Sequence, residues 1–531
     1  MSDYLEEQEI KSLKKKILYS FLIFLIPFII YLYSLLPCVG YGDSAEFQIL
    51  SHTFGVAHCT GYPIYILLGK IFTFIPIYNI AYRVNLMSAF FAAMTIMILY
   101  NTFLYLKISF LSSVIASLSF AFCYAFWAEA IWAEVYTLNA FFLSLIIFIL
   151  CKYNKDQKPV LLYLISLCCG LSFGNHVGTM VFIIPFICSY ILYLNISKKS
   201  WNLKVFLKAF VIFLSCIALE ALCIYWWHKG NYPIDYFAYI ESMPIRYQLQ
   251  DINFSSFYQK YLWLIMGKEG GTKMFSLPLV QIFKNLILFL FSFIKYFSIV
   301  GVFLGILGVL TNMKRMPKLF FLLCSMFLSL TGFYINYSEF RIQVFFIPMY
   351  VIFSFWLAWG TDKLLEYKWF NKYKEKKYFT LIIAISILFF IIFPQYILTG
   401  YLEKYPPVDN KGKILHLTTS PNPLKFRNNQ EAYNYGKKIL KRVEKDSIVF
   451  ASWSALNILK YFKYVEKIRE DIVIYHDWRE DILDIIKNNI NQRNIYFTEY
   501  IKAVPTTRSK LLNNYRLIKI KNLNLVKIQL F

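Results

Sequence analysis

Long apolar runs separated by short polar segments fill the chain from its N-terminus to about residue 399. A helix needs about 20 mostly apolar residues to cross the hydrocarbon core of a bilayer. On this criterion the sequence predicts about eleven spans, near residues 17–37, 80–106, 109–128, 131–151, 159–175, 177–196, 205–227, 286–312, 318–337, 342–360 and 378–399. The pattern therefore predicts a polytopic membrane protein of mainly α class.

Basic residues gather at one end of these predicted spans. Lysines precede the first span, and basic loops follow at 152–158, 198–204, 314–318 and 363–377. Short cytoplasmic loops of membrane proteins are rich in Lys and Arg, so these loops are predicted to lie inside. The formal net charge of +24 is accordingly interpreted as a signature of topology, and nucleic acid is not an expected partner.

Residues 62–77 are apolar but too short for a comfortable span, and Lys70 lies at their centre. A span here would turn every later basic loop outward, so we predict an amphipathic helix in the outer interface instead. Residues 38–80 then form one large external loop. Residues 229–277 are rich in Tyr and Trp and form a second external segment.

The character of the chain changes after Thr399, where prolines punctuate a polar linker. Strand-like and helix-like runs then alternate. The predicted strands are 447–451, 471–475 and 495–497, and the predicted helices are 430–445, 453–467 and 480–491. We therefore divide the chain into a transmembrane domain, residues 1–399, and a small external α/β domain, residues 400–531.

The polar residues of the membrane part, other than lysine, fall mostly at the predicted outer ends of the spans. Charged groups at membrane depth are costly and commonly mark a pathway or a site. This clustering predicts one external polar cavity. Its members are Asp43, Glu46, His52, His58, Arg83, Glu129, Glu134, Asn175, His176, Glu339 and Arg341.

Asp43 and Glu46 follow the first predicted span, three residues apart. Asp-x-x-Glu is a capping-box pattern, in which Asp43 caps a short helix and Glu46 bonds back to its first backbone N–H. The same spacing puts both carboxylates on one helix face, where Asp43 can act as a general base and Glu46 can orient it. The two interpretations are compatible.

The other candidates each have a structural alternative. Glu129 and Glu134 bind substrate or form a solvated turn, while Tyr136 and Asn139 are expected to point into the bundle. His176 contacts a phosphate or ends a helix as a hydrogen-bonded residue.

Arg83 and Arg341 contact a phosphate through forked hydrogen bonds, or they extend to the lipid headgroups. Glu220, within a predicted span, is expected to pair internally.

Ten cysteines show no paired metal-ligand spacing, so no metal site is predicted. Cys38 and Cys59 are both external in this topology, and a disulfide between them is a further expectation.

Several of these residues stand in motifs that resemble a known membrane family. The motifs are Gly42-Asp43-Ser44-Ala45-Glu46-Phe47, residues 55–65, Arg83-Val84-Asn85, residues 126–139, Gly174-Asn175-His176 and, more faintly, Glu339-Phe340-Arg341. The family, long labelled a domain of unknown function, is grouped with the GT-C glycosyltransferases and includes the animal O-mannosyltransferase that acts on plexin-type receptor domains. The sequence departs from it at Cys59-Thr60, where two prolines are more common.

The resemblance implies a GT-C fold, an external first loop with a catalytic acidic residue at the position of Asp43, and a sugar donor carried on a polyprenyl phosphate. We therefore expect a membrane glycosyltransferase that moves a hexose to Ser or Thr of an exported protein by single displacement, with inversion. Asp43 is the expected base and Glu46 its support. Expected substrate contacts are His58, Tyr62, Arg83, Glu129, Glu134, Tyr136, Asn139, Asn175, His176 and Arg341. No cofactor or metal is expected.

Two other functions fit the sequence. A glycosyltransferase could decorate envelope lipid or polysaccharide instead of protein, and a polytopic transporter or flippase could use Glu220 with the external carboxylates. The Ile-, Lys-, Asn- and Phe-rich composition is typical of a low-GC genome. We expect a bacterial inner membrane with the site facing the periplasm, the endoplasmic reticulum being the alternative.

Overall fold

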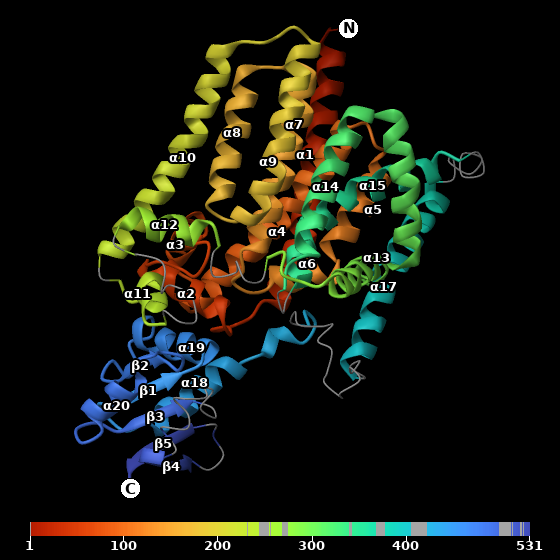
Figure 1. Cartoon of the computed structure of the whole chain (residues 1–531). Helices are drawn as coiled ribbons and strands as arrows, with labels where there is room; N and C mark the ends of the chain where they lie inside the picture. Colours follow the sequence, from red (N-terminus) through yellow and green to blue (C-terminus); the bar gives the residue numbers. More distant parts are fainter. Residues whose placement is uncertain are drawn as a thin grey trace.

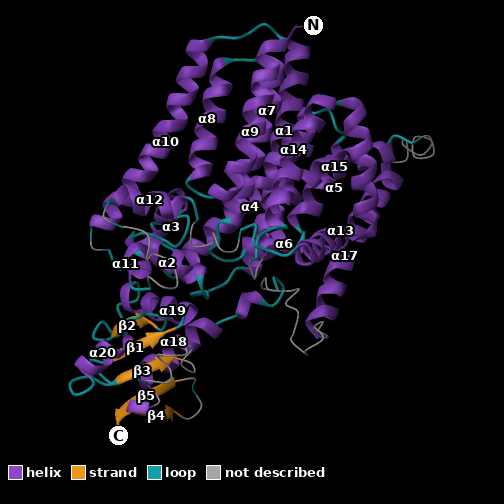
Figure 2. Ribbon diagram, in the orientation of Figure 1, coloured by secondary structure: helices purple, strands orange, loops and turns teal. Residues whose placement is uncertain are grey.

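The computed structural model describes residues 2–230, 232–243, 254, 256–267, 274–338, 342–367, 377–404, 422–498, 511, 513–520, 523 and 525–531. Up to Lys404 these residues are almost entirely helices and their connections, and the five-stranded sheet lies in the C-terminal part (Figure 2). The prediction of a mainly α membrane protein with a small C-terminal α/β part is confirmed.

The helix bundle consists of α1 (Ser2–Ser34), α4 (Ile80–Tyr105), α5 (Phe110–Ala121), α6 (Tyr124–Ala130), α7 (Tyr136–Asp156), α8 (Pro159–Phe173), α9 (Val177–Ser197), α10 (Leu203–Lys229), α13 (Leu279–Arg315), α14 (Pro317–Tyr334), η3 (Ile342–Phe346), α15 (Ile347–Leu365) and α17 (Lys377–Lys404). Every predicted span coincides with a helix or a helix pair. Among the described residues, 9 helices are long and apolar enough to cross a membrane, or 10 if α5 and α6, which meet at 64°, form one broken span. The predicted span at 159–175 falls short, because α8 has only 15 residues.

Four short helices form a layer at one end of the bundle, between it and the C-terminal part (Figure 1). They are α2 (Asp43–Thr53), α3 (Pro63–Thr73), α11 (Tyr236–Glu241) and α12 (Phe257–Ile265). The N-terminus and the basic connection between α9 and α10 lie at the opposite end. The two predicted external loops therefore share one end of the bundle, and α3 is the short helix expected within 62–77.

The C-terminal part contains η4 (Phe426–Asn428), α18 (Glu431–Arg442), β1 (Ile448–Ala451), α19 (Trp453–Tyr464), β2 (Val473–His476), α20 (Ile482–Asn489), β3 (Ile495–Thr498), β4 (Tyr515–Ile520) and β5 (Leu525–Leu530). The strand order is β2-β1-β3-β5-β4. β1 is parallel to β2 and β3, whereas β5 is antiparallel to β3 and β4. β1 and β3 are buried at every position, as expected for central strands covered on both faces.

Three of these strands were predicted, and β4 and β5 were not. The proposed boundary at residue 400 stays a prediction, since α17 continues to Lys404 and residues 405–421 lie outside the described residues.

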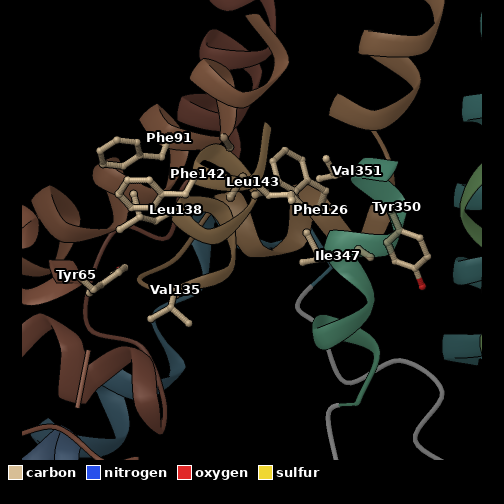
Figure 3. Packing of buried hydrophobic residues seen from close by; sticks show 14 of the residues in the cluster. Tyr65, Phe91, Phe126, Val135, Leu138, Phe142, Leu143, Ile347, Tyr350 and Val351 are labelled. Carbon is tan, nitrogen blue, oxygen red and sulfur yellow. The ribbon is translucent and has the colours of Figure 1, made fainter. Parts of the chain in front are cut away.

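A packed apolar core lies at the bundle end next to the short helices (Figure 3). It contains Tyr65 of α3, Phe91 of α4, Phe126 of α6, Leu138 of α7 and Ile347 of α15. One cluster thus holds the short helix α3 and the broken span to three long helices.

Two glycines let α13 and α15 approach each other closely. A Cβ on Gly308 would lie 1.6 Å from the backbone oxygen of Trp356, and a Cβ on Gly360 would lie 1.7 Å from that of Leu304. Small residues at helix contacts in membranes allow such approach, and dispersion between the backbones then stabilises the pair.

We predict that Gly308→Ala destabilises the folded protein by about 1–3 kcal/mol, the range for an overpacked core, because the two helices must separate. The midpoint of thermal unfolding in detergent should fall. Gly332→Ala on α14 is the matched control, since a Cβ there meets no atom within 4 Å. Equal midpoints for the two variants would contradict the prediction.

Candidate active site

The first turn of α2 presents the two carboxylates that the sequence singled out. Gly42 is the N-cap residue with φ 58°, a left-handed conformation that glycine adopts readily. Asp43 is therefore the first helical residue, and no side chain caps the helix. The expected capping box is wrong: Asp43 does not cap, and Glu46 turns to a different partner.

That partner is His58, in the loop between α2 and α3. The backbone N–H of His58 donates to Oε1 of Glu46 at 3.1 Å, and Oε2 of Glu46 contacts the ring Nδ1. The Glu46 side chain is fully buried. Burial raises the pKa of Glu46, whereas the charge and hydrogen bonds of His58 act in the opposite direction. Glu46 thus fixes the position of the imidazole.

Asp43 reaches the other side of the same imidazole. Its Oδ2 lies 3.7 Å from Nε2 of His58, and its Oδ1 accepts a hydrogen bond from the indole Nε1 of Trp453 at 2.7 Å. The side chain of Asp43 is 42% exposed, whereas that of Glu46 is 0% exposed. The spacing of three residues thus brings both acids to one histidine, but only Asp43 faces outward.

Aromatic rings surround His58. Its ring centroid lies 5.1 Å from that of Tyr62, 5.6 Å from Phe47 and 6.5 Å from Tyr236. The hydroxyl of Tyr62 donates to the backbone oxygen of Cys59 at 2.8 Å. Tyr62 therefore forms a wall of the site and holds the His58 loop in place.

The second external segment is joined to the first loop by its backbone. Val56 N–H donates to Ile234 O at 3.1 Å, and Tyr236 N–H donates to Val56 O at 3.1 Å. Gly55, with φ 136°, makes this approach possible, because a Cβ there would lie 2.3 Å from Ile234 O. α11 is thereby placed beside the His58 loop.

The C-terminal part of the chain closes the site with one face of α19. Besides the indole of Trp453, Asn457 Nδ2 donates to Gly42 O at 3.3 Å, and the hydroxyl of Tyr461 accepts from Ala81 N–H at 3.2 Å. Residues four apart lie on one helix face, so this face rests on the starts of α2 and α4. Burial lowers the pKa of Lys460, on the same helix, to about 8, and the charge of Glu46 opposes that shift.

A second polar group lies at the start of α9. His176 is the N-cap of α9, and its Nδ1 accepts from the N–H of Thr179 at 3.2 Å. Asn139 Nδ2 donates to Thr179 Oγ1 at 2.9 Å, and Asn175 Nδ2 donates to Val135 O at 3.3 Å. Burial lowers the pKa of His176 to about 4. The interpretation of His176 as a hydrogen-bonded helix end is confirmed, and its ring is neutral near pH 7.

Glu129 and Glu134 are both buried, so their interpretation as a solvated turn is wrong. Oε2 of Glu129 accepts from the indole of Trp132 at 3.1 Å, and the backbone of Glu134 is bonded to Ser88 Oγ. The broken span at α6 folds this segment inward instead of leaving it at the surface.

Tyr136 and Asn139 are at the start of α7, as expected of residues that point into the bundle. The ring of Tyr136 lies 6.0 Å from that of His176, and Asn139 is 1% exposed.

Arg83 is bound by its own chain. Its Nε, Nη1 and Nη2 donate to the backbone oxygens of Ile77, Thr73 and Tyr78 at 2.7, 2.8 and 3.0 Å. The guanidinium thus satisfies the end of α3 and the turn after it, and this geometry does not support an anion contact. Arg341 and Glu339 lie outside the described residues.

One other expectation is wrong: Cys38 and Cys59 are free thiols and form no disulfide. Glu220 is 3% exposed. Within the described ranges its Oε1 has no hydrogen-bond partner, while its carboxyl forms a hydrogen bond with the backbone of Gly174, so its internal partner is a backbone group. In the described part of the chain, no three His, Cys, Asp or Glu side chains group as metal ligands.

The stretch that carries the carboxylates also carries the likeness to known proteins. Residues 43–202 match the family model of the protein O-mannosyl-transferase TMEM260 N-terminal domain. The protein O-mannosyl-transferase TMEM260 of Mus musculus is 31% identical over 177 residues, 32% of this chain and 25% of that protein. The Dictyostelium discoideum protein of the same name is 25% identical over 215 residues, 38% of this chain and 26% of that protein. The chain therefore spans about a quarter of the length of these relatives.

The whole chain resembles a solved structure of the GT-C class. ArnT from Cupriavidus metallidurans bound to undecaprenyl phosphate covers 96% of this chain, and this chain covers 97% of ArnT, with a TM-score of 0.59 and 9% sequence identity. At this identity the likeness shows the fold, and the expected GT-C fold is confirmed. This protein is an integral membrane protein with an N-terminal region similar to TMEM260.

Sequence reasoning missed Trp453 and Asn457. The indole of Trp453 meets Asp43 across 410 positions of the chain. No local sequence pattern predicts such a long-range contact, although the helix at 453–467 was itself predicted.

We predict that Arg83→Lys lowers the stability of the protein and leaves binding of a lipid-linked sugar unchanged. An ammonium group cannot serve three carbonyls in this geometry, and each hydrogen bond lost lowers the stability by about 0.5–1.5 kcal/mol. Thermal unfolding in detergent measures the first effect and equilibrium binding the second. Arg442→Lys, on the exposed face of α18, is the control. Weaker binding at unchanged stability would restore Arg83 as an anion contact.

Proposed function

We propose that this protein is a membrane glycosyltransferase that moves a hexose from a polyprenyl-phosphate donor to Ser or Thr hydroxyls of an exported protein. The observation that carries the proposal is the difference between the two carboxylates. Glu46 is fully buried in contact with His58, while the side chain of Asp43 is 42% exposed and is held by His58 and Trp453. A general base must be ionised, fixed and accessible to the proton it removes. Asp43 meets the last two conditions in this structure.

In the proposed step, Asp43 takes the proton of the acceptor hydroxyl as its oxygen attacks the anomeric carbon. The bond from that carbon to the phosphate oxygen breaks, and its electron pair leaves with the lipid phosphate. Attack opposite the leaving group inverts the anomeric configuration. His58, ordered by Glu46 and 3.7 Å from Asp43, supports the carboxylate electrostatically.

The leaving phosphate needs positive charge nearby. Of the three candidates named from the sequence, Arg83 is engaged by backbone oxygens and His176 is neutral near pH 7. Arg341 keeps this role in the proposal. Reaction without a bound metal also remains part of the proposal.

The comparisons support the choice of donor and acceptor. The fold is that of ArnT, which was solved with undecaprenyl phosphate, and the N-terminal region matches proteins named protein O-mannosyl-transferase. Mannose is therefore the proposed hexose. The proposed setting is a bacterial inner membrane with the site facing outward, the reticulum membrane being the alternative.

We predict that Asp43→Asn lowers transfer about 10²–10⁴-fold, the usual contribution of a general base, with donor binding retained. Purified protein in lipid nanodiscs, a radiolabelled polyprenyl-phosphate mannose and Ser/Thr-rich acceptor peptides provide the assay. Asp484→Asn, on the exposed side of α20, is the control and should transfer at the wild-type rate. Full activity of Asp43→Asn would rule out Asp43 as the base.

The acceptor class is tested in cells. Mass spectrometry of exported proteins, compared between cells with the wild-type gene and cells with the Asp43→Asn allele, should show loss of a hexose on Ser or Thr in the mutant. An unchanged glycoproteome together with an altered envelope glycan would favour a lipid or polysaccharide acceptor. Retained glycosylation of both would count against a transferase.

A further inference from the structure

Trp453 connects the C-terminal domain to the proposed base by a single hydrogen bond. Its Nε1–H donates to Oδ1 of Asp43 at 2.7 Å, while His58 Nε2 lies 3.7 Å from Oδ2. The carboxylate is thus held on two sides, by groups from opposite ends of the sequence. A charge-assisted bond of this kind fixes the direction of the carboxylate.

The indole is itself held firmly. Tyr239 of α11 packs against it with ring centroids 5.3 Å apart, and the His58 ring lies 6.1 Å away. One turn further along α19, Asn457 is bonded to the backbone of Gly42, the residue before Asp43. The donor therefore keeps its place relative to the start of α2, as preorganised electrostatic contacts require.

We infer that Trp453 is a positioning residue for sugar transfer: its indole N–H holds the Asp43 carboxylate toward the acceptor hydroxyl, so that turnover requires the C-terminal domain to be docked on α2. The inference rests on the proposed function, because it takes Asp43 as the base. A purely structural role, in which Trp453 only fills space between α19 and α11, is the alternative to be excluded.

The experiment must separate the N–H from the ring and from its charged surroundings. The groups around Asp43 that titrate or carry charge are Glu46 of α2, His58 of the following loop, Tyr62 at the start of α3, Tyr236 of α11 and Lys460 of α19. Trp453→Phe leaves all of them in place and keeps most of the aromatic packing.

For Trp453→Phe in the full-length chain, assayed with polyprenyl-phosphate mannose in nanodiscs, we expect kcat to fall about tenfold, as for loss of one hydrogen bond to a charged group. The KM for the donor should stay within about twofold, since a base contributes to the chemical step. The loss should therefore appear in kcat and not in the binding of the donor.

Tyr461→Phe is the matched control. It removes another contact of the same face of α19, the one to Ala81, without touching Asp43. Under the inference, its kcat should fall less than that of Trp453→Phe. If Trp453→Phe is not recovered as folded protein, Trp453→benzothienylalanine, an isosteric tryptophan with sulfur in place of N–H, tests the same bond with the same shape.

Wild-type kcat in a variant that lacks the N–H would overturn the inference while leaving the proposed function intact. So would an equal fall in kcat in Trp453→Phe and Tyr461→Phe, because docking alone would then explain the effect. A wild-type protein without transfer, or a fully active Asp43→Asn, would instead refute the proposed function. The inference is supported when the loss of the N–H lowers kcat more than the loss of the Tyr461 hydroxyl does and leaves the KM for the donor unchanged.

Discussion

The buried contact between Glu46 and His58 is the interaction on which the rest of the site depends. A carboxylate without solvent carries a desolvation cost of several kcal/mol, which only close polar partners offset. Here one residue supplies two partners, a backbone N–H and a ring nitrogen. The loop after α2 must therefore fold back on the helix, and this return places the imidazole beside Asp43. The pair thus fixes the group that lies on one side of the Asp43 carboxylate.

The same contact explains why the site is assembled from distant segments. The fixed loop offers Val56 as a backbone partner to the second external segment, which brings α11 and its tyrosines next to His58. The start of α2 offers Asp43 and the carbonyl of Gly42 to α19. Each of these elements thus contacts the start of α2 or the loop that follows it, and the site lies in a layer between bundle and sheet, as Figure 1 shows for the elements.

Much of the fold could be predicted from the sequence, because a membrane span is encoded by a local apolar run. The limits of that signal are physical as well. α8 joins the bundle with too few residues to span by length alone, and it packs against α10 and α7. The run at 131–151 begins with a turn, since α7 starts only at Tyr136. β4 and β5 were not predicted, although β5 pairs with β3, which was.

For the candidate site, the sequence predicted where the polar residues lie in the fold better than it predicted what each of them contacts. Those polar residues that the structure describes do lie at one end of the bundle, as expected from the cost of placing charge in an apolar interior. What each one binds depends on neighbours that no local pattern encodes. Arg83 finds three carbonyls of its own chain at the end of α3. Glu129 and Glu134 are buried beside the bend at α6, and Trp453 comes from α19, 410 positions away from Asp43 in the chain.

The docking of the C-terminal domain is spread over several points, and this bears on how its contact with Asp43 can act. Glu480 N–H donates to Ser242 O at 3.1 Å, and the Arg427 guanidinium lies 4.1 Å from the centre of the Tyr33 ring. These contacts lie apart from α2, so removing one donor at Trp453 leaves the domain attached. The bond to Asp43 is therefore one of several docking contacts, but it is one of only two contacts described for the Asp43 carboxylate. Its loss should accordingly affect the reaction at Asp43 more than the attachment of the C-terminal part.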